Sequence, residues 1–177
     1  MRTLFEKGEL NVSKYLILYR HGLAEDKESS EEDDLRSLSK RGKILLKKSV
    51  GGFKTMISNY GDLKIYSSPV LRAKETAEML AEELGLDEPI YLEFLATGSG
   101  VSRLRELLKE IEPGNAAIVV GQQPYLSLWS QEISGTFLRF KKGSAACFSF
   151  PDEELGETKA DLRWFLQTRG FAKINDK

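Results

Sequence analysis

The chain has 177 residues, 41% of them hydrophobic and 30% charged, and its 26 basic side chains nearly balance 27 acidic ones. This length suits a single domain over residues 1–177 that buries a core without disulfides or a structural metal, and the dispersed charges offer no basic patch for nucleic acid. No apolar run is long enough to span a membrane, and residues 1–11 are too polar for a signal peptide. The single cysteine, Cys147, fits a reducing compartment. We therefore expect a cytoplasmic protein with neither a nucleic-acid nor a membrane partner.

The first predicted element is a buried strand over residues 15–19, an apolar run that stops at Arg20-His21-Gly22. A helix follows to about residue 60, with Ser39 as its N-cap and Gly51-Gly52 as a candidate interruption. The acidic residues 31–34 before this helix are interpreted as a solvated loop rather than as a screen against anions.

A second strand over residues 63–66 leads into a helix, for which Ser68 is the predicted cap and Pro69 the first helical residue. Apolar residues at spacings of three and four carry this helix to about Gly85. Further along the chain we predict strands over residues 89–92, 116–120, 145–150 and 161–166, and helices over residues 101–111 and from about 125 to 133.

Strands and helices alternate for the first two thirds of the chain, which predicts a mostly parallel sheet covered on both faces, with an antiparallel edge formed by the last two strands. The expected fold class is therefore a three-layer α/β/α architecture. Residues 1–13 and 168–177, at the two ends, are expected to be loosely ordered.

Polar motifs follow three of the predicted strands, at the edge of a parallel sheet where ligands usually bind. They are Arg20-His21-Gly22, Ser67-Ser68-Pro69 with Arg72 one turn later, and Gly121-Gln122-Gln123-Pro124. Arginine forks and helix amino-termini suit a phosphoryl group. The convergence predicts a phosphate pocket.

The histidine supplies this pocket with a nucleophile. A neutral imidazole nitrogen can attack phosphorus, and the resulting phosphohistidine can be hydrolysed in a second step. Gly22 allows the backbone to come close to bound oxygens. One histidine and one cysteine, far apart in the chain, do not make a metal site, so neither a metal nor a cofactor is expected.

The motifs resemble those of a known family, the histidine phosphatase superfamily, which has a phosphoglycerate mutase-like fold. Its Arg-His-Gly signature is matched by residues 20–22, its Ser-Ser-Pro-x-x-Arg-Ala-x-x-Thr-Ala block by residues 67–77, and its Val-Gly-His-x-Pro block by residues 120–124. Residues 38–42, Leu-Ser-Lys-Arg-Gly, are similar to a fourth block. The resemblance extends over about residues 14–150, and the short chain is most similar to the small SixA-type phosphohistidine phosphatases.

This resemblance implies roles for individual residues. His21 would be the phosphoryl acceptor, and Arg20 and Arg72 would clamp the phosphoryl oxygens together with Gly22 and Gln122. Gln122 stands where the family has a second histidine. Its amide can donate a hydrogen bond but carries no charge, so we expect a loss of about 1–3 kcal/mol of transition-state stabilisation, or roughly 10- to 100-fold in rate.

The resemblance also bears on the leaving group and the substrate. Larger relatives use an acidic proton donor, for which Glu93 is the candidate in this chain. A phosphohistidine substrate needs less help, because its P–N bond is labile. The leading interpretation is a phosphohydrolase that acts on a phosphorylated small molecule or a phosphohistidine protein, with reduced activity; the alternative is a phosphate-binding or regulatory module that has lost efficient turnover.

Overall fold

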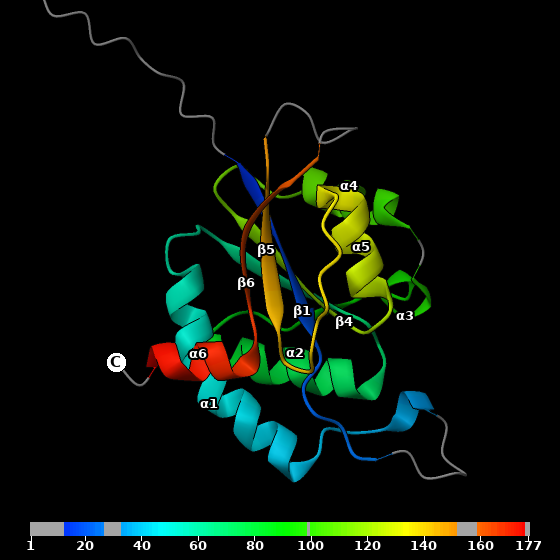
Figure 1. Ribbon diagram of the computed structural model, residues 1–177, viewed down its shortest axis with the longest axis vertical. Helices are drawn as coiled ribbons and strands as arrows, with labels where there is room; N and C mark the ends of the chain where they lie inside the picture. Colours follow the sequence, from blue (N-terminus) through cyan, green and yellow to red (C-terminus); the bar gives the residue numbers. More distant parts are fainter. Residues whose placement is uncertain (1–12, 27–32, 99, 152–158, 176–177) are drawn as a thin grey trace, which may run out of the picture.

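The computed structural model describes residues 13–26, 33–98, 100–151 and 159–175 (Figure 1). Within these ranges the strands form one mixed sheet in the order β3-β2-β4-β1-β5-β6. The first four strands are parallel to one another, and the last two pair antiparallel at the edge. The strands are β1 Lys14–Arg20, β2 Leu63–Ser67, β3 Ile90–Tyr91, β4 Ala116–Gly121, β5 Ala145–Phe150 and β6 Asp161–Leu166.

Helices cover both faces of this sheet, each over its own apolar core (Figure 1). One face packs against α1, α2 and α6, and the opposite face packs against α3, α4 and α5. The predicted three-layer α/β/α class with an antiparallel edge is confirmed. The helices are the 3-10 helix η1 Asp33–Leu35 and the α-helices α1 Lys40–Ile57, α2 Leu71–Leu84, α3 Phe94–Thr97, α4 Val101–Lys109, α5 Tyr125–Ser134 and α6 Thr168–Asn175.

The central strand β1 carries the first motif to the end of the sheet at which the parallel strands have their carboxyl ends. Because side chains alternate along a strand, Leu16 and Leu18 enter one core while Ile17 and Tyr19 enter the other, and all four are fully buried. Such burial contributes about 1.5–3 kcal/mol for each large apolar side chain. The strand therefore holds the residue that follows it, His21, in a fixed place.

The helix α2 begins later than predicted. Its N-cap is Val70, which makes no side-chain capping bond, and the first helical residue is Leu71 rather than Pro69. Ser68 is fully buried and its backbone N–H donates to Val120 O at 3.0 Å, so it still belongs to the strand connection. The end at Gly85 is confirmed, since this residue has the left-handed φ of +70° that favours glycine.

Two predictions about the helix layer are wrong, and they have one cause. Residues 168–175 are not loosely ordered but form α6, whose Phe171 is fully buried against α1. Gly51-Gly52 does not interrupt α1; instead, a Cβ at Gly52 would collide with the Phe171 carbonyl oxygen. The glycine allows α6 to approach α1 closely.

The predicted N-cap of α1 at Ser39 is confirmed, because its Oγ accepts from Gly42 N at 3.0 Å.

Candidate active site

His21 lies directly after β1, and its side chain is only 4% exposed. Its Nδ1 is 2.7 Å from the carbonyl oxygen of Gly22. A carbonyl oxygen can only accept, so Nδ1 carries the proton and Nε2 keeps its lone pair. The Nε group of Arg72 donates to this Nε2 at 3.3 Å.

The surroundings of His21 keep its ring neutral. The pKa of His21 is lowered to about 3, chiefly by burial and also by the nearby cations Arg72, Arg20 and Lys142, against the opposing effect of the Gly22 carbonyl. Both causes disfavour the imidazolium. The imidazole is thus unprotonated at neutral pH, as a nucleophile has to be.

Gly22 and the helix α2 hold this arrangement together. The Gly22 N–H donates to Thr76 Oγ1 at 3.0 Å, and the Thr76 hydroxyl donates to Arg72 O at 2.6 Å. A Cβ at Gly22 would lie 3.2 Å from a methyl carbon of Leu38. The backbone N–H of Gly22 is therefore engaged by Thr76, and any role of Gly22 toward phosphate rests on its lack of a side chain.

Arg72 reaches His21 from the first turn of α2, and its side chain is 7% exposed. Its Nη1 donates to the backbone oxygen of Asp33 at 2.6 Å, and its Nη2 donates to the Asp33 carboxylate at 2.9 Å. The interpretation of the acidic segment as a solvated loop is thus wrong for Asp33, which is drawn to the buried guanidinium. Residues 31 and 32 lie outside the described part of the chain.

Arg20 approaches from the end of β1. Its Nη1 donates to Phe140 O at 2.7 Å, while its buried Nε has no hydrogen-bond partner among the described residues. Burial and the nearby Arg72 both lower the pKa of Arg20. Arg20 and Arg72 therefore stand close enough to His21 and to each other to repel electrostatically, as residues that share an anion would.

Gln122 follows β4, next to the motif. The strand ladder pairs Gly121 with Arg20, and the His21 N–H donates to Gly121 O at 3.0 Å. The Gln122 side chain, 7% exposed, donates from Nε2 to Ala96 O at 3.3 Å, and its buried Oε1 has no hydrogen-bond partner among the described residues. Glu93 is exposed at the start of α3, three residues before Ala96, and no hydrogen bond or ion pair of the described residues joins it to His21.

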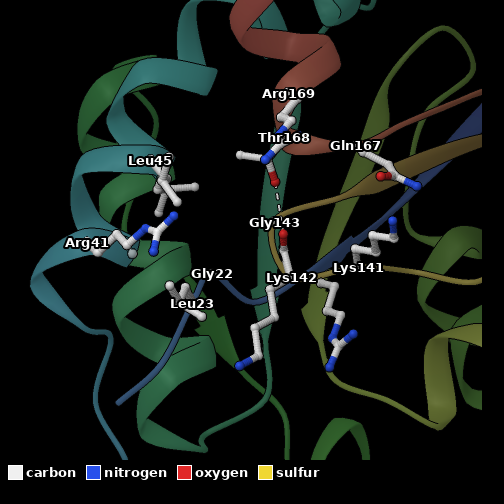
Figure 2. Close-up of a pocket in the computed structure, with 13 residues that line it drawn as sticks. Gly22, Leu23, Arg41, Leu45, Lys141, Lys142, Gly143, Gln167, Thr168 and Arg169 are labelled. Carbon is white, nitrogen blue, oxygen red and sulfur yellow. Dashed lines mark hydrogen bonds between the residues drawn. The ribbon is translucent and has the colours of Figure 1, made fainter. Parts of the chain in front are cut away.

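A cavity of about 600 Å³ adjoins this cluster (Figure 2). Arg20 and Gly22 line it, whereas His21, Arg72 and Gln122 do not. Its lining also contains Lys142, which lies outside the sequence motifs although this cation acts on the pKa of His21. The available signal was positional: β5 is antiparallel, so the residues before it lie at the edge where the parallel strands end.

Comparisons with known proteins found similarity in sequence and in fold. The family model "Histidine phosphatase superfamily (branch 1)" matches residues 16–96, which contain the first motif and Arg72 but not Gln122. An uncharacterized protein of the cyanobacterium Picosynechococcus sp. is 31% identical over 154 residues, which cover 79% of this chain and 92% of that protein.

Solved structures share the fold. The protein histidine phosphatase SixA, solved as a complex with tungstate, has a TM-score of 0.73 at 18% identity, over 88% of this chain and 97% of that one. A phosphoglycerate mutase from Plasmodium falciparum has a TM-score of 0.64 at 20% identity, over 88% of this chain and 91% of that one.

Fold and cluster together define a class: an α/β protein of the phosphoglycerate mutase-like type with a neutral histidine beside two arginines at the carboxyl edge of its sheet. Over residues 16–96 the chain is similar to the histidine phosphatase superfamily, and it shares the fold of SixA over 88% of its length. No helix in the described ranges has the length and apolar character of a membrane span.

Proposed function

We propose that this protein is a phosphohydrolase that transfers a phosphoryl group from its substrate to His21 and then to water. The observation that carries the proposal is the buried, neutral imidazole whose unprotonated Nε2 faces the guanidinium of Arg72. A nucleophile next to a charged phosphate-binding group is the minimum that phosphoryl transfer requires.

In the first step the phosphoryl group enters between Arg20 and Arg72, and Nε2 forms a bond to phosphorus while the bond to the leaving group breaks. The Arg72 Nε–H, which donates to Nε2 in this structure, turns to a phosphoryl oxygen. The Gly22 carbonyl, 2.7 Å from Nδ1, stabilises the positive charge that the ring acquires. Water then attacks phosphorus and releases His21.

Asp33 has to leave Arg72, or share it, when the substrate binds. Its carboxylate accepts from Nη2 at 2.9 Å, and a phosphoryl oxygen needs the same kind of donor. The Asp33 side chain is 42% exposed, so water can solvate it once it is displaced. The ion pair keeps the arginine oriented until an anion arrives.

Leaving-group chemistry narrows the substrate class. Asp33 contacts the cluster, but its carboxylate is bound to Arg72. A role for Glu93 as proton donor stays a proposal. Substrates whose leaving group departs without a carboxylic acid suit this site best. Phosphohistidine, as a small molecule or on a protein, meets that condition, and we propose a phosphohistidine phosphatase-like activity.

A second candidate function is a phosphate-binding or regulatory module with impaired turnover. Gln122 favours it, because one of its two amide N–H groups donates to Ala96 O and its buried oxygen has no hydrogen-bond partner among the described residues. The remaining N–H is neutral and supplies no charge to a phosphoryl oxygen.

The test uses purified protein with a phosphohistidine peptide and with a chromogenic phosphate ester, beside the variant His21→Ala. Phosphate release well above the variant's background with either substrate supports the enzyme. Background release, together with inorganic phosphate binding that Arg72→Gln weakens, supports the binding module. If neither release nor binding is found, both candidates fail.

A further inference from the structure

The cavity beside the active site is built from four segments that meet at the carboxyl edge of the sheet. Residues 22–23 follow β1, the first two turns of α1 form one wall, residues 141–143 precede β5, and residues 167–169 begin α6. Figure 2 shows Arg41 pointing from α1 into the cavity, with Lys141 and Lys142 on the opposite wall.

Its lining is strongly cationic. Four basic side chains, Arg41, Lys141, Lys142 and Arg169, join Arg20 there, and none of the lining residues is acidic. No ion pair joins these five to a carboxylate in the part of the chain that the structure describes. The chain as a whole has a net charge of −1, so this excess is local, and a concave site with one sign of charge attracts the opposite sign.

The start of α6 adds further donors. The first backbone N–H groups of a helix have no acceptor within it, and the helix dipole favours an anion there. Thr168, the first residue of this eight-residue helix, donates from Oγ1 to Lys142 O at 2.9 Å. The helix is thereby fixed to the loop that carries the lysines.

The cavity and the His21 site are rigidly connected. The Gly143 N–H donates to the carbonyl oxygens of Arg20 and His21, at 3.1 and 3.0 Å. Gly143 has a φ of +73°, and a Cβ there would lie 2.6 Å from Thr168 Oγ1, so this close fit requires glycine. Lys142 belongs to both places, because it lines the cavity and acts on the pKa of His21.

Size and an apolar wall indicate what the cavity takes. A volume of about 600 Å³ is that of a small-molecule site, and Leu23, Leu45 and Leu46 line it beside the cations. The ligand thus has an anionic group and a modest apolar part. Because Arg20 and Gly22, the neighbours of His21 in the chain, line the cavity, we infer that the phosphoryl group that is transferred and this anionic group belong to one molecule.

We propose that the site takes, beside phosphohistidine, a second class of substrate, an organic diphosphate, whose terminal phosphoryl group is transferred to His21 while the rest of the molecule lies in the cationic cavity; this rests on the proposed phosphohydrolase function. Nε2 of His21 bonds to the terminal phosphorus as the bridging P–O bond breaks, and the electron pair stays on the departing organic phosphate. Arg41 and Lys142 stabilise that anion, so no carboxylic acid is needed. Water then cleaves the N–P bond, and its proton passes to solvent.

The test compares phenyl diphosphate, phenyl phosphate and a phosphohistidine peptide by phosphate release. The wild-type protein is expected to hydrolyse phenyl diphosphate with a kcat/KM at least about tenfold above that for phenyl phosphate, and the peptide reports the proposed phosphohistidine phosphatase-like activity separately. In Arg41→Gln and Arg169→Gln the ratio of diphosphate to monophosphate kcat/KM falls by about tenfold, whereas Lys54→Gln, which removes the same charge from the far end of α1, preserves it.

A wild-type preference for phenyl phosphate over phenyl diphosphate overturns the proposal, as does a ratio that Arg41→Gln and Arg169→Gln leave intact. Binding separates it from the proposed function. In His21→Ala, which cannot turn over, calorimetry is expected to show that pyrophosphate binds more tightly than inorganic phosphate and that adding Arg41→Gln removes the difference. If pyrophosphate and inorganic phosphate bind this variant equally tightly, the cationic cavity does not bind a second phosphate group and the proposal is contradicted. If the wild-type protein turns over none of the substrates, only the phosphohydrolase function is contradicted.

Discussion

Replacing Gln122 by histidine tests how much of the superfamily's chemistry this site retains. The side chain is buried behind β4, donates to Ala96 O and leaves its Oε1 unpartnered in the described structure. A histidine would remove a buried acceptor without a partner and supply a donor that can become charged. We expect Gln122→His to raise kcat.

Two effects determine the expected changes in kcat and in stability. Charge-assisted hydrogen bonds are about twice as strong as neutral ones, so a donor that becomes cationic in the transition state is worth about 1–3 kcal/mol more than the amide. That corresponds to a gain in kcat of about 10- to 100-fold. Removing an unsatisfied buried oxygen also relieves a cost of about 1–3 kcal/mol, so the variant is expected to be no less stable than the wild type.

The assay is phosphate release under saturating substrate, with Gln122→Leu as the matched control because leucine has a similar size and no polar atoms. The leucine variant is expected to fall below the wild type, and the double variant His21→Ala with Gln122→His is expected to be inactive. A folded Gln122→His protein with unchanged or lower kcat would refute the reasoning, since it would mean that residue 122 does not act on the phosphoryl group.

Three further outcomes are expected. Thr76→Val leaves the buried Gly22 N–H unpaired and should lower the free energy of unfolding by about 1–3 kcal/mol, measured with denaturant, whereas Thr76→Ser should lose less. Asp33→Asn removes the charge that competes for Arg72 and should tighten inorganic phosphate binding by about fivefold, the equivalent of about 1 kcal/mol for a partly exposed pair; weaker binding would show that Asp33 positions the arginine instead. His21 has a pKa of about 3 when folded against 6.5 otherwise, so as the pH falls from 6.5 toward 3 the unfolded chain takes up a proton that the folded protein does not. Over that window the free energy of unfolding should fall more steeply than in His21→Gln, by up to about 1.4 kcal/mol per pH unit, and parallel pH profiles would contradict the buried neutral ring.

The sheet and the central motif could be predicted because local patterns determine them. An apolar run that stops at a polar motif identifies β1. The first and last residues of the antiparallel strands β5 and β6 coincide with the predicted ranges. The Ser39 cap is likewise a contact over three residues. The convergence of Arg20, His21 and Arg72 followed from the rule that parallel strands end at one edge.

What could not be predicted depends on contacts between distant parts of the chain. The helix α6 forms because Phe171 enters a core built by α1 and the sheet, although its eight residues contain few large apolar side chains. Asp33 is 39 residues from Arg72 in sequence. The cationic cavity arises only when the segment before β5 contacts α1 and α6. Neither local periodicity nor a family motif predicts that contact.

The central claim is that His21 accepts the phosphoryl group, and trapping the covalent intermediate tests it most directly. His21 is the only histidine in the chain, so any phosphohistidine formed can be assigned without ambiguity. Rapid mixing with substrate, an alkaline quench and mass spectrometry with phosphorus NMR are expected to show one phosphoryl group on Nε2 of His21, stable in alkali, lost in acid and absent from His21→Ala. Turnover at the wild-type rate by His21→Ala, or turnover without any acid-labile adduct on the protein, would contradict the account.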